Sequence, residues 1–290
     1  MSIIDVAGTD REPVLSRRHA AGAESARALL FTVLGEFVLP ESRAVWTSTF
    51  IGVLRRLGVE EKTSRQALMR TAADGWLTRQ RQGRRTLWTL SPPAVRLLTE
   101  GAERIYGFSG EQREWDGRWL LVLARPPESE RRARHLLRTR LAWAGLGSPA
   151  PGVWISTHPD RAPEAEQVLA EAGLRDDAQI FVAEHRGGGQ LSAMVAQAWD
   201  LQQIDERYGE FLTEFDRQPA DHQAVQDPLT RLVQLVHAWR RFPFVDPALP
   251  PELLPEPWSG ARAAELFRRQ RARWTAEATA EWIRIAGSAD

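Results

Sequence analysis

The chain has 290 residues, a hydrophobic fraction of 43% and a charged fraction of 26%, values typical of a globular protein large enough for two or three domains. It contains no cysteine, which excludes disulfides, thiol nucleophiles and cysteine-bound zinc, and no apolar run approaches the ~18 residues of a membrane helix. The formal net charge is zero, but residues 25–108 hold 13 Lys and Arg against 7 Asp and Glu. We therefore expect a cytoplasmic protein with one basic domain and an acidic remainder.

The amino-terminal part of the chain predicts a lead-in followed by two helices. Residues 1–24 carry charges throughout and lack an apolar core of signal-peptide length, so we expect a disordered segment. Residues Ala26–Leu39 are apolar and helix-favouring, and Pro40 is expected to end this first helix. Residues Val45–Leu57 place their apolar side chains on one stripe, which predicts a second helix.

Residues 59–90 predict a helix followed at once by a tight hairpin. Ser64, Ala67, Leu68 and Thr71 recur at i, i+3, i+4 and i+7, which indicates one buried stripe, and Asp74-Gly75 is a typical helix stop. Beyond that stop, residues 76–81 and 84–90 read as two strands around the turn Gln82-Gly83. A helix with such a hairpin is typical of a winged helix-turn-helix domain.

The free face of this helix and the tip of the hairpin carry the residues that we expect to contact DNA. Cations and amides on the helix can meet phosphates and the base edges of a major groove, while arginines on the hairpin suit a phosphate backbone. Lys62 is the only lysine, so arginine is the default cation here and its distribution is more informative than its number. The expected groove-facing residues are Lys62, Thr63, Arg65, Gln66 and Arg70, and the expected backbone contacts are Arg79, Arg81, Arg84 and Arg85.

The middle of the chain predicts a small α+β domain. Ser91–Phe108 should form a helix that closes the basic domain, and a turn-rich segment follows it. Strands are then expected at 118–124, 152–156 and 179–184, with helices at 130–143 and 162–172 and a loop at 145–151. Strands and helices that alternate with short links favour a ferredoxin-like fold.

The carboxy-terminal part predicts long helices separated by proline-rich chain. Helices are expected over 191–215, from Pro228 with Asp227 as its N-cap, and over 260–285, while the prolines within 242–258 favour an extended path. The sequence thus predicts an α+β protein with a lead-in (1–24), a winged-helix DNA-binding domain (25–108), a ferredoxin-like middle domain (115–187) and a helical carboxy-terminal domain (190–290).

Several segments resemble the PaaX family, the repressors of phenylacetic-acid degradation operons. The similarity extends from Ser25 to Ile285 and is carried by ARALLFTVLGEFVLP (26–40), DGWL (74–77), GRR (83–85), ERIY (103–106), AWDLQQIDERYGEFL (198–212) and LVHAWRRFPFVDPALPPELLP (235–255). This resemblance implies a winged helix, a middle domain of ferredoxin-like fold related to a CRISPR-associated nuclease, and a helical carboxy-terminal domain. It also implies a homodimer that binds a palindromic operator and is released by phenylacetyl-coenzyme A.

Such an effector, phenylacetyl-coenzyme A or another acyl-coenzyme A, would need cations for its phosphates and an apolar slot for its acyl group. Side chains of these types occur together in one segment. Alternatively, Arg240 and Arg241 form ion pairs with acidic neighbours such as Asp246 and Glu252, and His237 is a core or interface residue. The candidate ligand-binding residues are His237, Trp239, Arg240, Arg241, Phe242 and Phe244.

No catalytic or metal site is expected, and no cofactor apart from such an effector. The nuclease relatives carry a metal-binding Asp at the end of the first strand, where this chain has Leu123-Ala124-Arg125, and an arginine cannot ligate a hard divalent cation. The six histidines include no pair at ligand spacing. Our leading hypothesis is a ligand-responsive repressor that binds double-stranded DNA and no membrane. The alternatives are a nucleic-acid-processing enzyme acting through the middle domain and a winged helix that binds protein.

Overall fold

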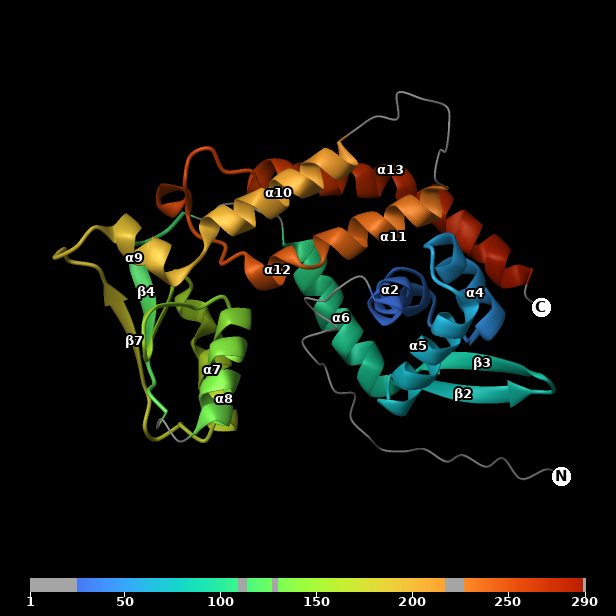
Figure 1. Ribbon diagram of the computed structural model, residues 1–290, viewed down its shortest axis with the longest axis horizontal. Helices are drawn as coiled ribbons and strands as arrows, with labels where there is room; N and C mark the ends of the chain where they lie inside the picture. Colours follow the sequence, from blue (N-terminus) through green and yellow to red (C-terminus); the bar gives the residue numbers. More distant parts are fainter. Residues whose placement is uncertain (1–24, 109–113, 127–129, 217–226, 289–290) are drawn as a thin grey trace. The chain divides into compact units, whose positions relative to one another are not determined.

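The computed structural model describes residues 25–108, 114–126, 130–216 and 227–288, and these residues group into two compact units (Figure 1). Unit 1 contains the chain up to Gly107 together with residues 217–241 and 266–290, and unit 2 contains residues 108–216 and 242–265. Helices are combined with antiparallel sheets, so the expected α+β class is confirmed. The expected lead-in, residues 1–24, lies outside the described residues.

The two units do not follow the chain in the order that the sequence suggested. We expected three consecutive domains after the lead-in, whereas the contacts divide residues 190–290 between both units. The reason is that helix α11 (Pro228–Trp239) and most of helix α13 (Gly260–Gly287) bury apolar side chains within the amino-terminal unit. Periodicity reveals that a helix has an apolar face, but not which partner covers it.

Unit 1 begins with three helical segments that run on without a break. The helix expected to end before Pro40 continues through a π-helical turn to Glu41, and it stops at Ser42, which has a left-handed φ of 50°. Pro40 is tolerated because it lies in the first turn of its segment, where its missing N–H costs little. The segments are α2 (Ala26–Val33), η1 (Leu34–Val38) and α3 (Leu39–Glu41), followed by β1 (Val45–Trp46), α4 (Thr47–Arg56), α5 (Glu61–Ala73), β2 (Leu77–Gln82), β3 (Arg85–Leu90) and α6 (Pro92–Gly107).

A three-stranded antiparallel sheet of order β1-β3-β2 completes unit 1 beside these helices. The prediction of helix at Val45 and Trp46 was wrong, because these two residues pair with Trp88 and Leu87 of β3 before α4 begins. The hairpin turn also lies one residue later than expected. Gln82 pairs with Arg85, so the loop is Gly83-Arg84, and the left-handed φ of 59° falls on Gly83, a conformation that glycine adopts without strain.

Aromatic contacts join the carboxy-terminal helices to the core of unit 1. Trp282 of α13 stacks on Phe37 with ring centroids 5.1 Å apart, and Trp239 of α11 stacks on Phe267 of α13 at 4.6 Å. Both tryptophans are buried. The amino-terminal helices therefore share one hydrophobic core with segments about two hundred residues away in sequence.

Unit 2 is built around a four-stranded antiparallel sheet of order β5-β6-β4-β7. The strands and helices expected between 118 and 184 occur within one or two residues of their expected bounds. Strand β5 was missed, since its residues GSPA were assigned to a loop. The elements are β4 (Arg118–Leu123), α7 (Arg131–Trp143), β5 (Gly147–Ala150), β6 (Val153–Ser156), η2 (Pro159–Arg161), α8 (Ala162–Glu171), β7 (Gln179–Glu184), α9 (Leu191–Ala198), α10 (Leu201–Phe215), α12 (Phe242–Val245) and η3 (Pro251–Leu253).

The two faces of the unit 2 sheet have different covers. On one face, Leu120 and Val122 of β4 belong to a buried cluster with residues of α7 and α8, and on the other, Trp119 clusters with Val195 of α9. The single helix expected over 191–215 is in fact two, because Trp199 is extended and the Asp200 carboxylate caps α10 by accepting a hydrogen bond from Gln203 N at 3.0 Å. No described helix combines the length and the apolar character needed to cross a membrane.

Candidate nucleic-acid interface and effector residues

Helix α5 buries the stripe that its sequence predicted. Ser64, Ala67, Leu68 and Thr71 are all buried. The two hydroxyl groups in this stripe are satisfied by the helix itself, since Ser64 Oγ donates to Glu60 O at 3.0 Å and Thr71 Oγ1 donates to Ala67 O at 2.8 Å. The packing side of α5 thus has no unsatisfied hydroxyl, and its opposite side faces solvent.

The exposed side of α5 presents a line of polar side chains. Lys62, Gln66 and Arg70 follow one another at i, i+4 and i+8, so they lie along one edge of the helix away from the buried stripe, and all three are exposed. Neither Lys62 nor Arg70 has an ion-pair partner in the described part of the chain. These two cations are therefore available to a polyanion.

Thr63 and Arg65 flank this line on opposite sides of α5, and both are exposed. Arg65 makes a two-pronged ion pair with Glu61 one turn earlier, with Nε and Nη2 at 2.9 and 2.8 Å from the same carboxylate oxygen. Such an exposed pair contributes only about 0.3–0.5 kcal/mol, so a phosphate or a base edge could displace Glu61.

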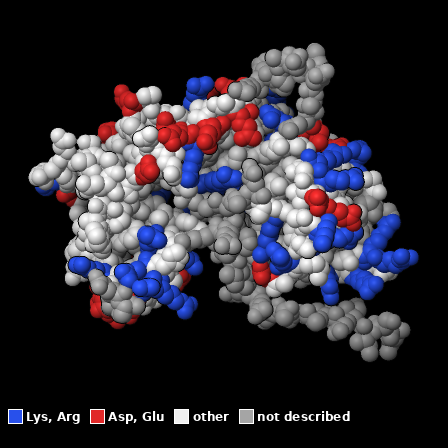
Figure 2. All heavy atoms as spheres, in the orientation of Figure 1, with Lys and Arg blue, Asp and Glu red and all other residues white. Residues whose placement is uncertain are grey.

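The hairpin places four arginines close to the exposed side of α5. Arg79, Arg81, Arg84 and Arg85 are all exposed, and Figure 2 shows the gathering of Lys and Arg at this end of unit 1. Arg81 Nε donates to Gly83 O at 3.2 Å, and the Arg85 guanidinium lies 5.7 Å from the ring centroid of Trp46. These contacts restrain the two side chains without neutralising their charge.

Hydrogen bonds hold α4, α5 and the hairpin in one arrangement. Trp76 N donates to Thr71 O at 3.1 Å, and Ser91 Oγ donates to Gly75 O at 2.6 Å. Trp88 Nε1 of β3 donates to Thr47 Oγ1 at the start of α4, at 2.8 Å. The nine residues expected to contact DNA are thus presented by a single rigid part of unit 1.

Three of the expected effector residues form a buried basic cluster at the end of α11. His237 Nδ1 lies 3.0 Å from Thr32 Oγ1, and burial together with Arg240 and Arg241 lowers the pKa of His237 to about 3, so the imidazole is neutral. Arg240 is 7% exposed, and neither its Nε nor its Nη2 has a hydrogen-bond partner in the described residues. Burial and the neighbouring Arg241 lower the pKa of Arg240 to about 10, which leaves it charged at neutral pH.

The three expected aromatic residues are core side chains, and they belong to two different units. Trp239 in unit 1 is fully buried, and its Nε1 donates to Ile105 O at 3.2 Å. In unit 2, Phe242 stacks on Tyr208 at 4.1 Å and the Phe244 ring lies 6.0 Å from that of Trp143. Asp246, which we considered as an ion-pair partner for arginine, accepts hydrogen bonds from Tyr208 Oη at 2.6 Å and Ala248 N at 2.7 Å within unit 2.

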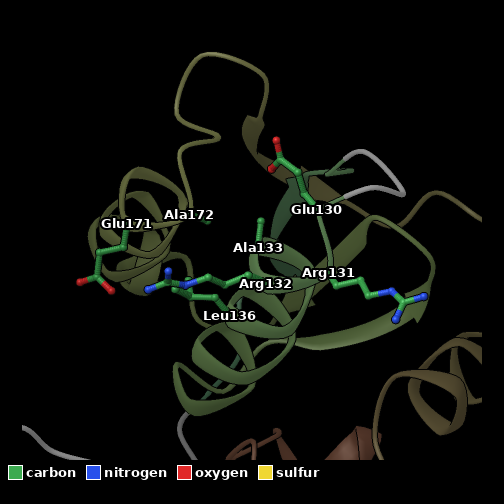
Figure 3. A pocket seen from close by; sticks show the side chains of 7 residues that line it. All are labelled: Glu130, Arg131, Arg132, Ala133, Leu136, Glu171 and Ala172. Atoms are coloured by element: carbon green, nitrogen blue, oxygen red, sulfur yellow. The ribbon is translucent and has the colours of Figure 1, made fainter.

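A separate cavity of about 470 Å³ lies beside α7 and α8 of unit 2, and none of the expected effector residues lines it. Figure 3 shows that Arg132 points toward Glu171 of α8 whereas Arg131 points away. The lining carries both signs of charge, which gives the cavity no preference for an anion. The described residues contain no group of three His, Cys, Asp or Glu side chains placed to hold a metal ion.

Comparison with known proteins relates nearly the whole chain to one family. Three family models match in succession: PaaX-like protein at residues 25–94, PaaX protein central Cas2-like domain at 112–195 and PaaX-like protein C-terminal domain at 199–284. The transcriptional repressor PaaX of Escherichia coli K12 is 31% identical over 262 residues, which cover 86% of this chain and 81% of that protein. In fold, the chain is similar to the uncharacterized protein Rv0674 from Mycobacterium tuberculosis, with a TM-score of 0.60 and 22% identity over 90% of this chain and 99% of that one.

Proposed function

Because this chain belongs to the PaaX family, we propose that it is a DNA-binding transcriptional repressor, a regulator rather than an enzyme, acting on a phenylacetate catabolic operon. In this proposal α4 and α5 act as a helix-turn-helix and the β2–β3 hairpin acts as its wing. The observation that carries it is the exposed line of Lys62, Gln66 and Arg70 on α5 beside the arginines of the hairpin. The strand order β5-β6-β4-β7, with α7 and α8 on one face, supports a ferredoxin-like fold for the middle domain.

The chemistry divides between the helix and the wing. An α-helix fits the major groove, where a glutamine can pair with adenine and an arginine with guanine, while arginines on the wing contact phosphates without reading sequence. As a homodimer the protein would present two copies of α5 to half-sites ~34 Å apart, so its symmetry would select a palindromic operator.

The wing gives the first prediction. In a fluorescence anisotropy titration against the upstream region of its own operon, the double variant Arg81→Ala/Arg84→Ala should bind every DNA sequence more weakly. The slope of log K against log salt should become shallower by about 0.9 for each phosphate that the variant no longer neutralises, because fewer counterions are released. The preference for the operator over unrelated DNA should be unchanged.

The matched control is Gln80→Ala/Gln82→Ala, which alters two exposed, uncharged residues of the same strand. Its salt slope should equal that of the wild type. A wild-type protein that shows no salt-dependent binding to DNA would refute the repressor and favour the winged helix that binds protein.

We further propose that an acyl-coenzyme A, with phenylacetyl-coenzyme A as the expected example, releases the repressor through Arg240 and Arg241. A buried guanidinium without a counterion is costly, and a phosphate or another anion would offset that cost. Support comes from the missing hydrogen-bond partners of Arg240 and from the orphaned Nε2 of His237 nearby on α11. The ligand would act as a population shift toward a state that binds the operator poorly.

The effector proposal predicts a specific loss. The wild type should leave its operator on addition of phenylacetyl-coenzyme A but not of free phenylacetate, whereas Arg240→Met/Arg241→Met should stay bound in the presence of the thioester. Methionine keeps the buried volume apolar, so this variant should remain folded. Arg268→Met, an exposed arginine of α13, is the control and should respond like the wild type.

Two other outcomes have distinct meanings. Release of both the double variant and the wild type would place the effector site away from Arg240 and Arg241. Specific DNA binding that ignores the thioester in every variant would retain the repressor and reject this effector.

A further inference from the structure

Strand β7 forms an open edge of the unit 2 sheet. It pairs with β4 along its whole length, from Gln179 opposite Leu123 to Glu184 opposite Arg118, and no described strand pairs with its other side (Figure 1). A row of backbone N–H and C=O groups is thus left for another strand to meet. Edge strands of soluble proteins usually carry charges, prolines or bulges that prevent such pairing.

The open edge of β7 has none of these protections at its centre. Only four large hydrophobic side chains are exposed in the described part of the chain, and two of them are the neighbours Phe181, 44% exposed, and Val182, 53% exposed. As successive residues of a strand they point to opposite faces of the sheet. Both faces of the edge are therefore apolar, and the only charge within the strand is Glu184 at its end, which forms an ion pair with Arg186.

The charges that flank β7 select its partner. Asp176 and Asp177 precede the strand, while His185 and Arg186 follow it, and all four are exposed. If a second copy of β7 lies antiparallel with Phe181 on the two-fold axis, Asp177 faces His185 of the other copy and Asp176 faces Arg186. Acidic and basic side chains thus meet at both ends of the pair.

The same register matches the apolar residues. Phe181 lies opposite its own copy, and Ile180 lies opposite Val182, as cross-strand pairs of aromatic and β-branched residues that stabilise antiparallel sheets. Paired residues have the same parity, so each face of one sheet continues into the same face of the other. The result is one eight-stranded sheet across a two-fold axis, which is the isologous contact expected of a homodimer.

We propose that β7 is the dimerisation strand of this protein and that its occupant is β7 of a second copy, paired antiparallel about Phe181. This inference rests on the proposed repressor function, since a homodimer is what a palindromic operator requires. It specifies the surface, the register and the residues that make the contact.

The absence of cysteine from the chain allows a direct test, because any introduced cysteine is unique. In the full-length protein, Phe181→Cys should be cross-linked to a covalent dimer by a short bismaleimide, since residues opposite one another on paired strands have Cβ atoms ~5 Å apart. Glu184→Cys is the matched control on the same exposed strand. Its two copies would lie six residues apart along the pair, ~20 Å, and should not be cross-linked.

Light scattering gives the second measurement. The wild type should have twice the monomer mass of 32.7 kDa, and Val182→Arg should return it to the monomer mass while circular dichroism remains unchanged, because Val182 is mostly exposed. A monomeric wild type, or a dimer that persists in Val182→Arg while the Phe181→Cys variant is not cross-linked, would overturn the proposal. Neither result would affect salt-dependent operator binding by unit 1, so failure of this interface can be told from failure of the repressor function.

Discussion

The double variant Gln66→Ala/Arg70→Ala is expected to bind the operator about 10²- to 10⁴-fold more weakly than the wild type. Each good base contact in the major groove contributes about 1–3 kcal/mol of discrimination, and these two side chains lie on the same exposed edge of α5. Affinity for unrelated DNA should fall much less, because phosphate contacts of the hairpin are retained. The measurement is competition anisotropy with operator and scrambled duplexes at one fixed salt concentration.

This result would separate reading of sequence from attraction of phosphate. Arg96→Ala, an exposed arginine of α6 in the same unit, is the control and should keep the operator preference. Equal losses on operator and scrambled DNA in Gln66→Ala/Arg70→Ala would mean that α5 contacts only the backbone. The assignment of α5 as the recognition helix would then be wrong.

The variant Trp282→Ala is expected to destabilise unit 1 by about 3–5 kcal/mol and to abolish operator binding with it. Trp282 is 1% exposed, stacks on Phe37 and lies 6.3 Å from Phe50 of α4, so its removal leaves a cavity inside the DNA-binding unit. Urea unfolding followed by far-UV circular dichroism should show an early transition for unit 1.

The neighbouring residue provides the control for this experiment. Ile283 is on the same helix but 55% exposed, and Ile283→Ala should change the free energy of unfolding by no more than about 0.5 kcal/mol. If Trp282→Ala unfolded no earlier than Ile283→Ala, the carboxy-terminal helix could not be part of the core that supports α5. DNA binding would then depend on residues 25–108 alone.

The recognition surface could be predicted because its geometry is local. The buried stripe of α5, the stop at Asp74-Gly75 and the two strands of the hairpin depend on residues within about thirty positions of one another, and all are present in the structure. The basic residues of this region are exposed as expected. Whether they contact DNA depends on a partner, so their roles stay predictions.

Elements that depend on distant pairing were the ones predicted wrongly. Val45 and Trp46 have helix-compatible neighbours, but pairing with β3 forty residues later makes them a strand. Gly147–Ala150 lacks the β-branched residues of a typical strand and is held by β6. The exposure of Phe181 and Val182 was also missed, because an apolar strand gives the same pattern whether it is central or at an edge.

The sequence by itself determined the helices and strands with strong periodicity, the basic character of the amino-terminal unit and the family, because each of these is a local or compositional property. Only the tertiary structure decided which segments share a core. It assigned α11 and the end of α13 to the DNA-binding unit, left Arg240 buried without a hydrogen-bond partner for its Nε and Nη2 among the described residues, and placed β7 at an open edge. An apolar face lowers its free energy against any suitable apolar partner, so the choice among distant partners depends on the packing of the whole chain.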